Sequence, residues 1–302
     1  MTKPLLSVVI PTWNRAHIVC EAIESALAQR AGEVEVIVVD DCSTDATIDL
    51  VKKTFGSRVQ VVQQMERGGQ GRARNLGVLL AGGEFVGLLD SDDIWLPGKL
   101  DAELRVFAEF PEAIALITDS RNSFEGQLDS SSRFAQNGLL DETRGRVRLV
   151  DDCGWLWTNS SITAHMCGIT VRRTALAKLG PRLFAEDLSC CEDWEFQMRL
   201  YSLGPVAVLP KIFSSVRRFN DGTRLGRAIP GQKFNREQEI ALLRARLTVI
   251  ERSKTWLHNL RADRAAELER FRVENEEQLS RLTDIEDKIS RKGGKAQSYA
   301  AN

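Results

Sequence analysis

Residues 85–93 read Phe85-Val86-Gly87-Leu88-Leu89-Asp90-Ser91-Asp92-Asp93, an apolar run that leads directly into three carboxylates. Such a run is typical of a buried strand in a parallel sheet, so the aspartates fall at its carboxyl end, where open α/β sheets bind ligands. Clustered carboxylates repel one another unless a cation neutralises them, and Mn²⁺ or Mg²⁺ suits their oxygens. The stretch therefore predicts a metal-bridged nucleotide diphosphate or, more simply, an acidic turn in which Asp93 caps the next helix.

Two upstream strands also end in polar residues. Residues 6–10 lead into Pro11-Thr12-Trp13-Asn14-Arg15, and residues 36–39 lead into Asp40-Asp41-Cys42-Ser43-Thr44-Asp45. Apolar residues at helical spacing follow each strand, over 18–27 and over 45–55. This alternation of strand and helix predicts an α/β fold with a parallel sheet.

A glycine-rich segment follows the third expected strand, residues 59–62. It reads Gly68-Gly69-Gln70-Gly71-Arg72-Ala73-Arg74-Asn75-Leu76-Gly77 and opens into a helix. Glycines permit close approach of a ligand to the backbone, and guanidinium groups suit a phosphate or the edge of a base. Three strand ends thus bring nucleotide-binding chemistry to one edge of the sheet.

Four motifs in this order resemble the inverting family 2 glycosyltransferases of the GT-A fold. They are residues 7–15, residues 38–45, residues 73–77 and the Asp90-Ser91-Asp92 segment, which corresponds to the family's DxD motif. The resemblance covers about the first hundred residues. It implies a Rossmann-like nucleotide-binding sheet with helices on both faces, and transfer of a sugar from a nucleotide-diphosphate donor, with a UDP-sugar as the first candidate.

The same resemblance implies roles for individual residues. The nucleoside would contact Pro11, Thr12 and Asn14, and the base would hydrogen-bond Asp40. Arg74 would lie near the base or diphosphate, and Asp90 would lie near the ribose. Asp92 would bind an Mn²⁺ or Mg²⁺ ion.

Composition agrees with an enzyme of this kind. The chain has 302 residues, 43% hydrophobic and 27% charged, with a net charge of −1. A general nucleic-acid binder would carry a basic excess, so no nucleic-acid partner is expected. The sequence shows neither an apolar run long enough to span a membrane nor the pattern of a signal peptide. We expect a cytoplasmic protein, or one peripheral at the inner face of the membrane, whose six cysteines are reduced packing residues rather than disulfides or zinc ligands.

The middle of the chain is less regular. We expect a helix over 97–110, a strand over 114–118, short elements and loops over 119–150, and a strand over 168–171. Trp155 and Trp157 could form a platform for a sugar or one face of a buried strand. His165 is a candidate acceptor contact or an ordinary half-buried histidine.

A second acidic pair opens the helix expected from Cys191 through Leu203. Glu192 and Asp193 lie in its first turn, where the helix dipole favours negative charge. In the resembling family, the Asp of such a pair is the general base, and Asp193 matches it. Inversion needs a carboxylate that takes the proton of the attacking hydroxyl. Glu186 and Asp187 are the nearest rivals for this role.

Strands are expected over 206–209 and 212–216, followed by the arginine-rich segment 217–227. Many family members carry an Arg-x-His there, and this chain has no such His. Asn220, Asp221 or water could take its place on the metal. Arg218 and its neighbours fit a mobile phosphate clamp or a solvated basic loop. The Gln-x-x-Arg-Trp motif of processive synthases is missing, which favours transfer of a single sugar.

The character changes after residue 233. Glycine and proline vanish over 234–289, and apolar residues follow heptad spacing, with a hinge or register shift expected between Arg261 and Arg272. Such a stripe predicts a long coiled-coil helix that joins copies of the chain into a homo-oligomer, with a partner protein or a fold-back hairpin as the alternatives. The expected organisation is a catalytic domain over 1–232 (nucleotide-sugar binding over 1–118, acceptor side and base over 119–232), a helical extension over 233–292, and a disordered tail over 293–302.

The sequence thus favours a metal-dependent inverting glycosyltransferase that acts on a hydroxyl acceptor, such as a bacterial surface glycan, a glycolipid or another glycoconjugate. Two alternatives stay open. A sugar-nucleotide pyrophosphorylase would place an N-terminal glycine-rich loop where this chain has Pro11 to Asn14. A non-catalytic scaffold acting through the coiled coil predicts damaged motif positions, whereas Asp90, Asp92 and Asp193 are all present.

Overall fold

The structure is a computed structural model that describes residues 3–29, 33–124, 126–151, 164–188, 190–219, 236–257 and 262–298. The chain divides into two units. The first, here called the sheet unit, comprises residues 1–187 and 192–222, and the second, the helical unit, comprises residues 188–191 and 223–302.

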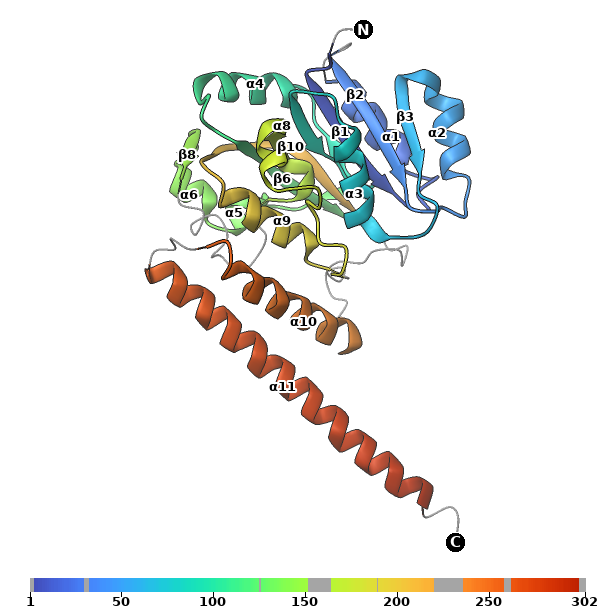
Figure 1. Cartoon of the computed structure of the whole chain (residues 1–302), viewed down its shortest axis with the longest axis vertical. Coiled ribbons are helices and arrows are strands. Elements are labelled where there is room, and N and C mark those ends of the chain that lie inside the picture. Colours follow the sequence, from blue (N-terminus) through green and yellow to red (C-terminus); the bar gives the residue numbers. More distant parts are fainter. Residues whose placement is uncertain are drawn as a thin grey trace. The chain divides into compact units, whose positions relative to one another are not determined.

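The sheet unit is built on a ten-stranded sheet in the part of the chain that the structure describes (Figure 1). The path of the main strands across it is β3-β2-β1-β4-β9-β6-β10-β5, with β7 beside β6 and β8 beside β10. The strands are β1 (Leu6–Thr12), β2 (Val34–Asp40), β3 (Val59–Gln63), β4 (Phe85–Leu88), β5 (Ile94–Trp95), β6 (Ala115–Phe124), β7 (Gln127–Leu128), β8 (Arg148–Val150), β9 (Ile169–Arg172) and β10 (Val206–Arg218).

The first four strands pair in parallel, as the βαβα pattern predicts. The other half of the sheet is mixed, because β9 runs antiparallel to both β4 and β6. In the β1–β2 pair, Thr12 lies opposite Asp40. The motif residues at the ends of these two strands are therefore neighbours across the ladder.

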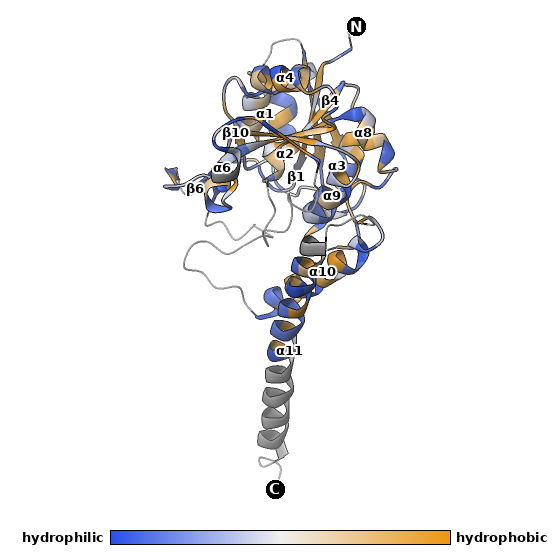
Figure 2. Ribbon diagram, turned by 90° about the vertical axis from the view of Figure 1, so that its left-hand side faces the viewer, coloured by the Kyte–Doolittle hydropathy of each residue, from blue (hydrophilic) through white to orange (hydrophobic). Residues whose placement is uncertain are grey.

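Helices cover both faces of the sheet, as expected. The alternation of side chains along β1 explains this, since Val8 and Ile10 belong to one buried cluster and Val9 to the other. One cluster includes residues of α1 (Val19–Leu27), α2 (Thr47–Phe55) and α4 (Lys99–Glu109); the other includes residues of α3 (Gly69–Leu80), α5 (Arg133–Gln136), α6 (Leu139–Thr143), α8 (Arg173–Lys178) and α9 (Glu192–Tyr201). Figure 2 shows the hydrophobic colouring along the strands between them.

A glycine brings α3 close to the sheet. A Cβ added at Gly77 would lie 2.3 Å from Val9 Cγ1 on β1, so only glycine permits this approach. The contact holds the glycine-rich start of α3 above the carboxyl ends of β1 and β2.

Two expected strand boundaries differ from the structure. The strand expected over 114–118 continues to Phe124, and the strands expected over 206–209 and 212–216 are one strand, β10. The register of β10 against β6 shifts between Leu209 and Ser214, so an irregularity carries the strand through Pro210 and Lys211, which separate the two expected strands. Trp155, Trp157, Asn220 and Asp221 lie outside the described residues.

The described residues of the helical unit, 190–191, 236–257 and 262–298 among them, form two helices where one long coiled-coil helix was expected. They are α10 (Arg236–Ser253) and α11 (Ala262–Ser298), and α11 extends past residue 293, where we expected a disordered tail. Gln278 Nε2 contacts Glu239 Oε1 at 2.5 Å, and the guanidinium of Arg246 lies 5.7 Å from the ring centroid of Phe271. These contacts make the two helices an antiparallel hairpin.

Helix α10 ends at Ser253, before the hinge that we expected between Arg261 and Arg272. Short-range backbone hydrogen bonds follow Ser253, such as Trp256 N to Ser253 O at 2.9 Å. The physical reason for the difference is that a hairpin covers apolar residues of one helix with those of the other, which a single extended helix cannot do. No helix in the described parts of the chain is long and apolar enough to cross a membrane.

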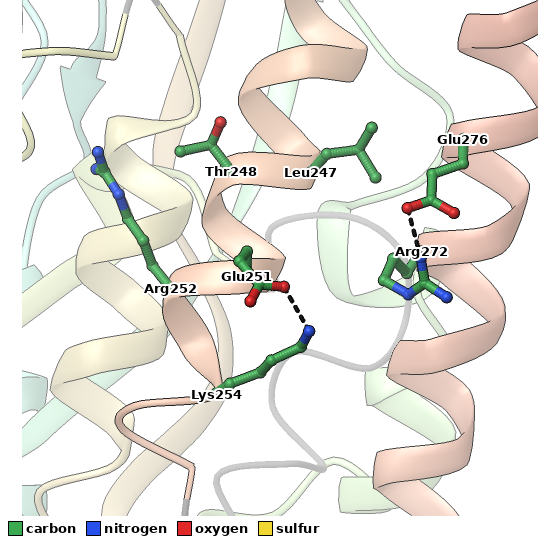
Figure 3. Close-up of a pocket in the computed structure, with 7 residues that line it drawn as sticks. All are labelled: Leu247, Thr248, Glu251, Arg252, Lys254, Arg272 and Glu276. Atoms are coloured by element: carbon green, nitrogen blue, oxygen red, sulfur yellow. Dashed lines mark hydrogen bonds and ion pairs between the residues drawn. The ribbon is translucent and has the colours of Figure 1, made fainter.

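A shallow pocket of about 440 Å³ lies in the helical unit (Figure 3). It is lined by Leu247, Thr248, Glu251, Arg252, Lys254, Arg272 and Glu276. Its charged side chains already pair with one another, Lys254 with Glu251 and Arg272 with Glu276. The pocket therefore offers charges that are largely neutralised and no residue of the nucleotide-binding motifs.

Candidate functional site

The carboxyl ends of β1 and β2 carry two buried polar atoms without partners. Thr12 is 3% exposed and Asp40 is fully buried, and they lie opposite each other in the strand register. Asp40 Oδ2 accepts a hydrogen bond from Ser43 N at 3.0 Å. Asp40 Oδ1 and Thr12 Oγ1 have no partner among the described residues. Because such groups are costly to bury unpaired, this edge of the sheet is suited to a polar ligand.

Asn14 connects the loops that follow β1 and β2. It adopts a positive φ of 52°, its backbone N–H donates to Ser43 Oγ at 2.8 Å, and its Oδ1 accepts from Thr44 N at 2.8 Å. The structure thus engages the side chain of Asn14 within the protein, where the family resemblance implies a nucleoside contact. Pro11 is a buried residue of β1.

Asp41 anchors the loop between β3 and α3, a role that the sequence reasoning missed. Its Oδ1 accepts from Gly68 N at 2.6 Å and from Gln64 Nε2 at 2.9 Å, and its Oδ2 accepts from Gly69 N at 2.9 Å. The only signal for this role was the second carboxylate of the Asp40-Asp41 pair beside a glycine-rich loop. The anchor places the loop next to the orphan atoms of Thr12 and Asp40.

An arginine of that loop covers the aromatic side chain that follows β1. The guanidinium carbon of Arg67 lies 3.7 Å from the centroid of the Trp13 ring. Arg67 Nε is also 4.0 Å from Asp41 Oδ2, and the Arg67 side chain is 54% exposed. Neither residue was assigned a role from the sequence.

Arg74 joins the DxD segment to the helix that carries the expected base. Its side chain is 2% exposed, and it donates to Asp90 Oδ1 at 2.7 Å and to Glu192 Oε1 at 2.9 Å. Burial alone would lower the pKa of Arg74, but the charges of Asp90 and Glu192 outweigh it and hold the pKa above its usual value. Arg74 was expected near the base or diphosphate, and the structure places it between these two carboxylates.

Asp92 lies beside two arginines. Its Oδ2 is 3.7 Å from Arg15 Nη2, and its carbonyl accepts a hydrogen bond from Arg217 Nε at 2.6 Å. Arg217 also donates its backbone N–H to Asp93 Oδ1 at 3.1 Å. Arg218, which the sequence predicts as a binding residue for the nucleotide sugar, donates to Asn122 Oδ1 at 3.1 Å. Alternation along β10 explains this, since adjacent side chains point to opposite faces.

The protein side chains described here do not form a complete metal site by themselves, so a divalent ion would bind together with a substrate. Across the described residues, no group of three or more His, Cys, Asp or Glu side chains is arranged to hold a metal ion. Asp90 Oδ1 lies 2.7 Å from Arg74 Nη2 and Asp92 Oδ2 lies 3.7 Å from Arg15 Nη2, and the family resemblance assigns the ion to Asp92. Mg²⁺ usually binds through one or two carboxylates, waters and substrate phosphates, so Asp92 and a diphosphate fit such an ion.

Asp193 lies in the first turn of α9, and its Oδ1 accepts from Trp194 N at 2.8 Å. Burial and the neighbouring charge of Glu192 raise the pKa of Asp193 to about 7. A carboxylate with that pKa is well matched to proton transfer near neutral pH. Of its rivals, Glu186 accepts a hydrogen bond from Asn75 Nδ2 at 3.0 Å.

Asn75 fixes the segment that precedes α9. Its Oδ1 accepts from the backbone N–H groups of Leu183 and Phe184, at 3.0 and 2.8 Å, and its Nδ2 donates to Phe184 O at 2.9 Å. The sequence reasoning noted Asn75 only as part of a motif. Together with Arg74, it makes α3 the element that links the nucleotide-binding edge to the segment before Asp193.

His165 belongs to a separate group of polar residues. Its Nδ1 lies 2.7 Å from Ser120 Oγ on β6. Next to Ser120, Asp119 is buried and accepts from Phe134 N at 2.9 Å, and burial raises its pKa. These contacts fit the interpretation of His165 as a half-buried histidine with a partner.

Comparisons with known proteins agree with this geometry. The model of the family described as Glycosyl transferase family 2 matches residues 7–174. A chondroitin synthase from Escherichia coli is 29% identical over 211 residues, 69% of this chain and 28% of that protein. The poly(ribitol-phosphate) beta-N-acetylglucosaminyltransferase TarS from Staphylococcus aureus is 33% identical over 199 residues, 65% of this chain and 32% of that protein. The chain therefore spans about a third of the length of these relatives.

Solved structures show the same fold. Residues 1–349 of S. aureus TarS, in complex with UDP-GlcNAc, superpose with a TM-score of 0.63 at 23% identity, over 87% of this chain and 69% of that one. The mannosyltransferase PcManGT from Pyrobaculum calidifontis, in complex with GDP-Man and Mn²⁺, gives a TM-score of 0.61 at 17% identity, over 100% of this chain and 77% of that one. With the strand-end site and the family match, these findings establish that the chain belongs to glycosyl transferase family 2.

Proposed function

We propose that the protein is a metal-dependent inverting glycosyltransferase that moves one sugar from a UDP-sugar to a hydroxyl acceptor. The observation that carries the proposal is the pair of buried, unpartnered atoms, Asp40 Oδ1 and Thr12 Oγ1, next to the strand end that carries Asp90 and Asp92. A pyrophosphorylase is not favoured, because the chain has Pro11 to Asn14 where such an enzyme would have a glycine-rich loop. A non-catalytic scaffold is not favoured either, because Asp90, Asp92 and Asp193 are all present.

The orphan pair suits the imide edge of uracil. That edge offers an N–H donor between two carbonyl acceptors. A carboxylate oxygen such as Asp40 Oδ1 can accept the N–H, while the hydroxyl of Thr12 can donate to a carbonyl beside it. Guanine also offers an N–H beside a carbonyl, so a GDP-sugar is the competitor that an experiment must include.

The diphosphate would lie toward Asp92 and Arg217. Arg217 Nη2 is buried and has no partner among the described residues, so it can donate to a phosphate oxygen. Asp92 and the phosphate oxygens would hold Mn²⁺ or Mg²⁺, which supplies positive charge to the departing diphosphate. Arg217 thereby takes the role that we had expected for Arg218.

Asp193 would remove the proton of the acceptor hydroxyl as that oxygen attacks the anomeric carbon from the face opposite the diphosphate. Its raised pKa keeps it a competent proton acceptor near neutral pH. Arg74 positions α9 against the donor side through its contacts with Asp90 and Glu192. Direct displacement by the acceptor inverts the configuration at the anomeric carbon.

The acceptor class follows from the relatives alone. Their names refer to chondroitin, poly(ribitol-phosphate) and teichuronic acid, all of which carry hydroxyl groups. We infer a hydroxyl acceptor on a bacterial glycan or glycoconjugate, reached from the cytoplasm or from the inner face of the membrane.

A donor screen tests the proposal. The protein would be incubated with UDP-, GDP- and dTDP-sugars, with and without Mn²⁺, and release of the free nucleotide would be measured without an acceptor. We expect slow Mn²⁺-dependent release from at least one UDP-sugar and little from the GDP-sugars. Release of nucleotide from GDP-sugars alone would contradict the assignment of a UDP-sugar donor. Equal release with and without Mn²⁺ would contradict the metal dependence.

A further inference from the structure

The contact between Trp13 and Arg67 lies next to the strand end where we propose that the nucleobase binds. Trp13 follows directly after Thr12, whose orphan hydroxyl faces Asp40 across the strand register. The guanidinium of Arg67 lies 3.7 Å from the Trp13 ring centroid, too close for a base to fit between them. A base held by Thr12 and Asp40 that stacks on this face of the Trp13 ring must therefore displace Arg67.

A base is expected to bind the face of the Trp13 ring more strongly than the Arg67 guanidinium does. An exposed cation–π contact favours the stacked form by only about 2- to 5-fold, whereas base–aromatic stacking contributes about 5-fold to more than 100-fold in affinity. The second contact of Arg67, to Asp41 at 4.0 Å, is a long ion pair of a half-exposed side chain and adds little.

The displaced guanidinium cannot travel far, because its backbone is held on both sides. Asp41 accepts hydrogen bonds from Gly68 N and Gly69 N after Arg67, and the carbonyl of Asp40 accepts one from Gln64 N, at 2.9 Å, before it. Only the Arg67 side chain has to move. A planar guanidinium stacks well on an aromatic face, so the outer face of the bound base is a suitable new partner.

We propose that Arg67 is the outer half of a nucleobase clamp, in which the base takes the place of the guanidinium on Trp13 and Arg67 then stacks on the opposite face of the base. This inference rests on the proposed function, since it needs a nucleotide at this edge. It adds to that function a positioning residue, Arg67, that belongs to the donor site and lies outside the four motifs.

Calorimetry with uridine monophosphate tests the clamp, because this probe contains the base but no diphosphate. We expect Arg67→Ala to weaken binding by about 3- to 10-fold. Arg67→Lys should stay at least about 2-fold weaker than the wild type, since lysine keeps the charge but loses the planar stack. Arg58→Ala is the matched control, because Arg58 lies over the Phe55 ring at 5.3 Å beyond the opposite end of β3.

Each other outcome decides against the clamp. Unchanged or tighter binding in Arg67→Ala would show that Arg67 only covers Trp13 in the free protein, and full affinity in Arg67→Lys would show that charge alone acts. Ribose 5-phosphate, which has no base, should bind the wild type and Arg67→Ala equally. If the wild type binds neither uridine monophosphate nor UDP, the proposed function fails with the clamp, whereas normal wild-type binding with a silent Arg67→Ala overturns the clamp alone.

Discussion

At the residue scale, the environment of Asp193 predicts a dependence of the rate on pH. Burial and the charge of Glu192 raise its pKa to about 7. A base must be ionised to accept a proton, so kcat should rise with pH up to about 7 and fall about tenfold per unit well below it. A pH–rate profile with saturating donor and acceptor checks this, and a profile that is flat between pH 5 and 8 would contradict the assignment.

Replacing the same carboxylate separates binding from chemistry. Asp193→Asn should lower kcat by roughly 10²- to 10⁴-fold with little change in the KM for the donor, because the base acts on the acceptor proton in the transition state. Glu186→Gln serves as the control at the nearest rival. If Asp193→Asn turns over normally while Glu186→Gln does not, the role of base moves to Glu186.

Arg74 is the residue whose loss should affect both stability and the pH profile. Arg74→Met leaves Asp90 and the buried Glu192 without their shared cation. Breaking such a buried network costs on the order of 3–5 kcal/mol in the free energy of unfolding. Arg74 also lowers the pKa of Asp193, so the rising limb of the pH–rate profile should move to higher pH in the variant. Chemical denaturation and the profile measure the two effects, and a variant that changes neither would disprove the coupling.

At the scale of elements, a buried ion pair connects α4 to β9. Lys99 and Glu103, fully buried or nearly so, pair with each other, and Thr170 Oγ1 on β9 lies 3.0 Å from Glu103 Oε2. Lys99→Met should destabilise the protein by about 3–5 kcal/mol, because it leaves the buried carboxylate of Glu103 without its cation.

The double variant Lys99→Met/Glu103→Leu should recover much of that loss, because it removes both charges together. Glu109→Gln, at an exposed position of the same helix, is the control and should change little. Denaturation midpoints of the four proteins check the prediction. If the double variant is less stable than Lys99→Met, the two charges do not form the unit described here.

The elements themselves were largely predictable from the sequence where one physical pattern dominates. Apolar runs and helical spacing predicted β1 to β4 and the helices between them, because burial of those faces leaves few alternatives. The irregularity in β10 was not predictable, since pairing with β6 resumes beyond Pro210 and Lys211, which separate the two expected strands. The choice of Arg217 over Arg218 needs the direction of alternation along β10, which only the strand register provides.

The site shows the same division. Asp40, Asp90, Asp92 and Asp193 were predicted from motifs at strand and helix ends, and their roles stay predictions. Asp41 and Asn75 could not be predicted in this way, because they act on backbone groups of loops that are distant in sequence. Likewise, heptad spacing predicted helices after residue 233 but could not distinguish one long helix from the hairpin of α10 and α11, since the spacing is the same whether the stripe is covered by another chain or by the chain's own second helix.

At the scale of the whole molecule, we still propose a homo-oligomer held by the C-terminal helices. Val273, an exposed apolar residue of α11, is 39% exposed in the chain by itself. A dimer should be seen for the full chain in light scattering, and truncation after Leu260 should yield a smaller species that still binds nucleotide. A full-length monomer would contradict self-association and leave the hairpin as the sole cover of the stripe.

We propose that Asp92 and a nucleotide diphosphate bind a divalent ion at the carboxyl edge of the sheet. Calorimetry of UDP with Mn²⁺, for the wild type and for Asp92→Asn, tests it most directly. We predict that the variant binds UDP with Mn²⁺ at least about tenfold more weakly, because it loses the charged ligand of the ion, while both proteins bind uridine monophosphate without metal equally well. Equal affinity of the two proteins for UDP with Mn²⁺ would contradict the account.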